Sequence, residues 1–121
     1  MKILIVDDSK AMRLIVKRIL RQTDIGEHNT VEAVNGQEGL KQVEAENPDL
    51  VISDWNMPEM NGIDFLKAVR ESGNNVKFGF VTTEGSAKMR DMASEAGANF
   101  LIAKPFTPES FEDSIMPALN L

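Results

Sequence analysis

A chain of 121 residues, 42% of them hydrophobic and 26% charged, suffices for one packed core, so we expect a single domain over residues 1–121. The formal net charge of −6 opposes direct binding to nucleic acid, and the absence of cysteine excludes disulfides and thiolate metal sites. No apolar run reaches the ~20 residues of a membrane helix, and the chain enters a strand pattern without a secretory signal. We therefore expect a cytoplasmic protein with no membrane partner.

The hydrophobic pattern predicts five strands that alternate with five helices. Apolar runs at 3–6, 50–53 and 77–81 are typical of strands covered on both faces, whereas the alternation at 30–34 indicates a half-exposed edge strand, and 99–103 is the fifth strand. The helices have recognisable starts, at Ser9, Asn35-Gly36, Asn61-Gly62, Ser86 and Thr107-Pro108. Strands joined by helices predict right-handed βαβ units, and therefore an α/β fold with one parallel sheet.

The first helix, expected over 10–21, carries two sets of side chains. An apolar stripe at helical spacing predicts its core side, with Met12, Ile15, Val16 and Ile19. Its cations are interpreted as a solvated face, with Lys10, Arg13, Lys17, Arg18 and Arg21. On the fourth helix, Met89 and Met92 are expected to fill core space. His28, the sole histidine, is expected to be exposed and without a metal or phosphotransfer role.

Polar residues gather where the predicted strands end. Asp7 and Asp8 follow the first strand, Asp54 follows the third, and the fourth and fifth end at Thr82 and Lys104. Because parallel strands end along one edge of the sheet, these groups should converge there. Neighbouring carboxylates repel each other unless a divalent cation lies between them, and hydroxyl and ammonium groups bind phosphate oxygens. The pattern predicts a Mg²⁺-dependent site where a carboxylate attacks phosphorus.

Four blocks of sequence match one family in order and over essentially the whole chain. They are Ile5-Val6-Asp7-Asp8-Ser9, Ser53-Asp54-Trp55-Asn56-Met57-Pro58 with Gly62, Val81-Thr82, and Lys104-Pro105-Phe106. The chain resembles response-regulator receiver domains, nearest the single-domain chemotaxis regulators of the CheY type. The resemblance implies a flavodoxin-like (βα)5 three-layer sandwich whose parallel five-stranded sheet has the strand order 2-1-3-4-5.

The resemblance also implies a role for each acid of the site. Asp54 matches the phospho-acceptor, which receives its phosphoryl group from a sensor histidine kinase. Asp8, Asp54 and the backbone carbonyl of Asn56 match direct Mg²⁺ ligands, and Asp7 matches the acid that acts on the metal through water.

Other positions match groups that respond to phosphorylation. Thr82 matches the hydroxyl that moves onto the new phosphoryl group, and Lys104 matches the ammonium that pairs with it. Asn56 and Glu84 match the positions that tune dephosphorylation, and both residue types are those of fast-turnover chemotaxis proteins. A short-lived phosphorylated state is therefore expected, in a protein that is not an enzyme beyond its own phosphorylation and autodephosphorylation.

The expected output is protein–protein signalling, of a chemotaxis type, by a monomer. The resemblance implies that phosphorylation switches the face formed by helix 4, strand 5 and helix 5 for a downstream protein. Leu101 departs from the family, which often has Tyr or Phe there. Phe100 is expected on the opposite face because side chains alternate along a strand, so it should pack in the core. The aromatic half of the usual switch is then absent, which weakens the case for binding a flagellar motor switch.

Alternative functions remain open from sequence. A flavin-binding module fits the architecture, but Asp7 and Asp8 would repel a flavin phosphate. A phosphatase with an Asp nucleophile needs a second acid two residues further on, where Asn56 stands. A receiver that only docks, a receiver that signals in another process, and a phosphate shuttle also fit the sequence.

Overall fold

The computed structural model describes residues 1–120, which form five strands and five helices in alternation. The strands are β1 (Lys2–Val6), β2 (Asn29–Ala33), β3 (Leu50–Asp54), β4 (Lys77–Thr82) and β5 (Phe100–Ala103). The helices are α1 (Lys10–Arg21), α2 (Gly36–Glu46), α3 (Gly62–Glu71), α4 (Ala87–Ala96) and α5 (Pro108–Ala118). None of these helices is both long and apolar enough to cross a membrane.

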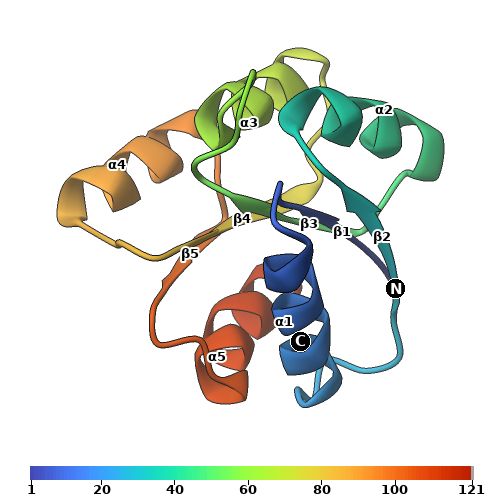
Figure 1. The fold of residues 1–121 in the computed structure, drawn as a ribbon, viewed down its shortest axis with the longest axis vertical. Helices are drawn as coiled ribbons and strands as arrows, with labels where there is room; N and C mark the ends of the chain where they lie inside the picture. The colour runs from blue at the N-terminus through green and yellow to red at the C-terminus, as the bar shows by residue number, and fades with distance from the viewer. Residues whose placement is uncertain (121) are drawn as a thin grey trace.

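The strands form one parallel sheet in the order β2-β1-β3-β4-β5. Helices α1 and α5 cover one face of the sheet, and α2, α3 and α4 cover the other (Figure 1). The flavodoxin-like three-layer sandwich and its strand order are thus confirmed. Strand β2 lies at an edge and is only partly buried, as its alternating pattern predicts.

Two cores lie on the two faces of the sheet because side chains alternate along each strand. Leu4 and Val6 of β1 join the cluster beneath α2, α3 and α4, whereas Ile3 and Ile5 join the cluster beneath α1 and α5. The first cluster is built around an aromatic row in which Phe78 contacts both Phe65 and Phe80, and the second is centred on Phe111 and Ile115 of α5.

Side-chain caps set the start of every helix. The cap residues Ser9, Asn35, Asn61, Ser86 and Thr107 each accept a hydrogen bond from a backbone N–H in the first turn of their helix. Such caps satisfy donors that the helix itself leaves unpaired. The caps at Ser9, Ser86 and Thr107 are those predicted from the sequence, whereas Asn35 and Asn61 were predicted only as turn residues before their helices.

Two apolar residues lie outside the core that their spacing predicted for them. Ile15 is 44% exposed, because α1 packs on the sheet through Val16, Ile19 and Leu20. Met92 is 42% exposed, because only Ala93 of α4 is fully buried against the sheet. Met89 packs against the first core, so the core assignment on α4 was right for Met89 and wrong for Met92.

Candidate functional site

Three carboxylates converge at the carboxyl edge of the sheet. The pairing of β1 with β3 aligns Val6 with Ser53, so the next residues, Asp7 and Asp54, lie side by side. Together with Asp8 they present carboxylate oxygens that all lie within 4.8 Å of one another. The convergence predicted from the strand ends is therefore present for these three acids.

Burial makes this cluster electrostatically costly without a cation. Asp7 is 6% exposed, and its Oδ1 accepts a hydrogen bond from the backbone N–H of Ser9 at 2.8 Å. Burial, reinforced by the negative charges of Asp54 and Asp8, raises the pKa of Asp7 to about 6. Burial also raises the pKa of Asp54, although the N–H of Trp55 donates to its Oδ1 at 2.8 Å. A divalent cation would remove this repulsion, and carboxylate oxygens are ligands that Mg²⁺ prefers.

The loop after β3 is held against the cluster by a close backbone approach. The N–H of Gly62 donates to the carbonyl of Trp55 at 2.8 Å. A Cβ on Gly62 would run into the backbone carbonyl of Asp54 and would lie 2.7 Å from the ring of Phe80. The start of α3 therefore requires glycine at position 62. Asn56 lies in the loop that this contact holds in place, and its side chain is exposed.

The remaining predicted residues lie on the same edge but differ in environment. Thr82 is 3% exposed, and its hydroxyl accepts a hydrogen bond from the backbone N–H of Glu84 at 3.2 Å. Lys104 follows β5 and is exposed, as is Glu84. Within residues 1–120, neither Lys104 nor Glu84 forms an ion pair. Their proposed roles are therefore still predictions.

Arg13 is a positioning residue that the sequence analysis missed. Its Nη1 donates to the backbone carbonyl of Asp7 at 2.7 Å, and its Nε donates to Glu32 at 2.9 Å. Lys17 lies 3.4 Å from the other oxygen of Glu32, and the hydrogen bond from Arg13 is the main reason that the pKa of Glu32 is lowered. The solvated-face interpretation was wrong for these two cations. The sequence feature that could have predicted these contacts is Glu32, a single acid on an edge strand, because a partly buried carboxylate needs a cation nearby.

The two residues at the fifth strand face opposite sides of the sheet, as strand alternation predicts. Leu101 is 7% exposed and belongs to the core beneath α4, whereas Phe100 packs against the core beneath α5. Phe100 is only partly buried, and its ring covers Gly79, where a Cβ would collide with it. The switch role of Leu101 stays a prediction.

The fold, with its acid cluster at the carboxyl edge of the sheet, defines a signalling receiver module. A family model described as the response regulator receiver domain matches residues 3–116, and the chain belongs to this family. Chemotaxis protein CheY of Pseudomonas aeruginosa is 43% identical over 117 residues, covering 95% of this chain and 93% of that protein. CheY1 of Helicobacter pylori is 40% identical over 124 residues, covering 99% of this chain and 98% of that protein.

Solved structures agree with this assignment. Chemotaxis protein CheY4 of Vibrio cholerae superposes with a TM-score of 0.86 and 32% identity, covering 98% of each chain. The protein is thus a receiver of the CheY type, a component of two-component signalling.

Proposed function

We propose that Asp54 accepts a phosphoryl group from a phosphohistidine of a sensor histidine kinase. The observation that carries this proposal is the cluster of Asp7, Asp8 and Asp54, whose oxygens lie within 4.8 Å of one another. In the transfer, an oxygen of Asp54 forms a bond to phosphorus as the bond from phosphorus to the histidine nitrogen breaks. The histidine leaves as a neutral imidazole because its other ring nitrogen carries a proton, and the carboxylate of Asp54 becomes an acyl phosphate.

The donor set fits Mg²⁺. Asp8 and Asp54 would hold the ion directly with the carbonyl of Asn56, and Asp7 would act through water. All are hard oxygen donors, and two of the carboxylates have raised pKa values because burial disfavours their charge. When bound, Mg²⁺ neutralises the carboxylates and the oxygens of the incoming phosphoryl group.

Residues of the chain then have defined tasks around the phosphoryl group. The N–H of Trp55 orients the Asp54 carboxylate through its 2.8 Å hydrogen bond. The phosphoryl group adds negative charge and three acceptor oxygens, which the hydroxyl of Thr82 and the ammonium of Lys104 would bind. For Thr82 this requires its hydroxyl to turn from Glu84 toward Asp54, which would pull on the loop between β4 and α4.

That loop is packed directly on the fifth strand. A Cβ on Gly85 would lie 2.6 Å from the Cβ of Ala103 and 3.5 Å from a methyl of Leu101. Arg90 of α4 donates to the carbonyl of Leu101 at 3.1 Å. Motion that starts at Thr82 is therefore transmitted to β5 and α4 by contact, without an aromatic side chain at position 101. The face of α4, β5 and α5 is our proposed binding surface for a downstream protein.

Phosphorylation alone does not complete the proposed switch, and binding of the downstream protein is also required. Shifting a population from 1:99 to 99:1 takes about 5.5 kcal/mol. Two hydrogen bonds to a charged phosphoryl group, at about 1.5–3 kcal/mol each, give about 3–6 kcal/mol; because Thr82 must first give up its hydrogen bond with the N–H of Glu84, the net gain supplies only part of this energy. Preferential binding of the downstream protein to the phosphorylated form supplies the rest. We propose that the protein acts as a monomer in chemotaxis-type signalling and binds its downstream protein in the phosphorylated form. Beyond forming and hydrolysing its own acyl phosphate, it would turn over no substrate.

Incubation with acetyl phosphate and Mg²⁺, read by intact mass, tests the phospho-acceptor. The wild type should gain one phosphoryl group and lose it quickly once the donor is removed, because Asn56 and Glu84 flank the attacking water. Asp54→Asn should gain none, whereas the matched control Asp91→Asn, which changes an exposed acid of α4, should behave as the wild type. Uptake by Asp54→Asn, or a phosphorylated state lasting many hours, would contradict the proposal.

A further inference from the structure

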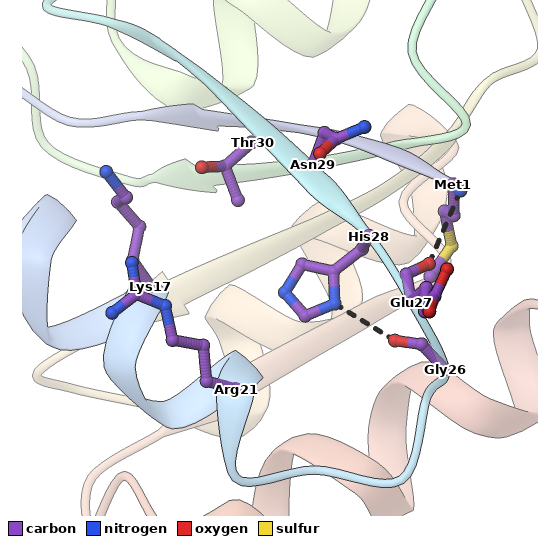
Figure 2. Close-up of a pocket in the computed structure, with 8 residues that line it drawn as sticks. All are labelled: Met1, Lys17, Arg21, Gly26, Glu27, His28, Asn29 and Thr30. Carbon is purple, nitrogen blue, oxygen red and sulfur yellow. Dashed lines mark hydrogen bonds between the residues drawn. The ribbon is translucent and has the colours of Figure 1, made fainter.

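A pocket far from the acid cluster lies between the end of α1 and the start of β2. Its volume is about 720 Å³, and Figure 2 shows the residues that line it. Asn29 in its wall pairs with Lys2 at the start of β1, whereas Asp7 follows the end of that strand. Five residues of strand separate the two levels, which is about 16 Å. The pocket is therefore distinct from the candidate phosphorylation site.

Cations from α1 form one wall of this pocket. Lys17 and Arg21 lie one turn apart on the helix and both line the cavity. Arg21 is exposed, and within residues 1–120 its guanidinium has no ion-pair partner. Lys17 is only loosely held, since its Nζ lies 3.4 Å from Glu32 while Arg13 bonds the same carboxylate at 2.9 Å. Arg21 is thus available to a ligand, whereas Lys17 would share its ammonium between Glu32 and the ligand.

His28 supplies the opposite wall with a defined tautomer. Its Nδ1 lies 3.1 Å from the carbonyl oxygen of Gly26, and because a carbonyl only accepts, Nδ1 carries the proton. The other ring nitrogen, Nε2, is left without a proton in the neutral ring, and in Figure 2 it faces the side chains of Lys17 and Arg21. The ring is half-buried, contrary to the exposed position expected from sequence.

The charge of this pocket differs in sign from that of the whole chain. The chain carries a net charge of −6, yet the side chains that line the pocket include two cations and one imidazole but a single acid, Glu27. In Figure 2 the Glu27 side chain lies beside Met1, away from Lys17 and Arg21. Such a local excess of cations favours an anionic ligand.

We propose that this pocket binds a small molecule that carries a phosphate monoester. Its volume is within the range of about 300–1,000 Å³ that is usual for small-molecule sites. The guanidinium of Arg21 and the ammonium of Lys17 can both donate charge-assisted hydrogen bonds to phosphate oxygens. A phosphate monoester has a second pKa near 6, so it can form a hydrogen bond with Nε2 of His28 in two ways. Its monoanion donates a hydrogen bond to the neutral ring, and its dianion accepts one from an imidazolium. A carboxylate or sulfate only accepts, so it lacks the first of these bonds.

Nuclear magnetic resonance titration of the isotopically labelled protein tests the proposal. Inorganic phosphate and glycerol 3-phosphate are added at constant ionic strength in the presence of EDTA, so that no divalent cation recruits phosphate to the acid cluster. We expect saturable shifts of the amides at 26–30 and 17–21, and sulfate should bind more weakly. Shifts confined to the acid cluster, the absence of saturation, or equal affinity for sulfate would overturn the assignment.

Matched variants identify the residues responsible. Arg21→Gln should weaken phosphate binding by about tenfold or more, since it removes a charge-assisted hydrogen bond. Arg18→Gln removes the same charge from an exposed position of α1 that does not line the pocket, and it should bind as the wild type. His28→Phe should abolish the preference for phosphate over sulfate. Asp54→Asn should leave the titration unchanged, which separates this proposal from the proposed phosphorylation. Equal weakening by Arg18→Gln and Arg21→Gln would show a diffuse charge effect and refute the site.

Discussion

Replacing Asp7 with asparagine should stabilise the Mg²⁺-free protein at alkaline pH. The substitution removes a buried negative charge, and the amide oxygen of asparagine can still accept the 2.8 Å hydrogen bond from the N–H of Ser9. In the folded wild type, burial and the charges of Asp54 and Asp8 raise the pKa of Asp7 from 3.8 to about 6. The folded state therefore binds this proton more tightly than the unfolded state does.

The sign and size of the effect follow from this difference in pKa. A carboxyl with a raised pKa costs little stability at about pH 4, near its pKa in the unfolded chain; the cost grows from there to about pH 6 and is complete above the folded-state pKa. The full difference corresponds to about 3 kcal/mol at most. Solvent near the carboxylate edge screens part of the charge, so we expect Asp7→Asn to gain about 1–2 kcal/mol at about pH 8.

Urea unfolding in EDTA, followed by far-ultraviolet circular dichroism, measures this gain at about pH 8 and about pH 4. The gain should be present at the higher pH and largely lost at the lower, and Asp91→Asn should show it at neither. Saturating Mg²⁺ should reverse the order, because the wild type then has the stronger site. Equal stabilities at about pH 8, or a gain at about pH 4 as large as that at about pH 8, would refute the repulsion argument.

Three further predictions concern the elements around the site. Gly62→Ala should lower stability by about 1–3 kcal/mol, because the new Cβ collides with backbone and with the Phe80 ring; an unchanged melting temperature would contradict this. Thr82→Val should still be phosphorylated by acetyl phosphate but should lose the phosphorylation-dependent amide shift of Glu84; a retained shift would remove the hydroxyl from the switch. Arg70→Met removes the hydrogen bonds from Arg70 to the carbonyl of Gly97, the residue that caps the C-terminus of α4, so amide hydrogen exchange in α4 should accelerate. Unaltered protection of α4 would show that Arg70 does not stabilise this helix.

The sequence alone determined the order and type of the elements, because those depend on local rules. The first helix occupies residues 10–21 as expected, since a capping serine and an apolar stripe define it. The edge position of β2 was readable from its alternation of polar and apolar side chains. The acids of the site were readable as well, because a short polar residue directly after a buried strand must emerge at the edge of the sheet.

Only the tertiary structure decided which side chains meet and how they titrate. The pairing of Val6 with Ser53 brings Asp7 against Asp54, and burial by surrounding elements then raises the pKa of both acids. The same holds for Arg13, which reads as a surface charge until β2 places Glu32 beside it. Ile15 fits a core stripe by spacing and is exposed in the structure. These outcomes depend on packing between segments distant in sequence, and periodicity within one segment carries no information about them.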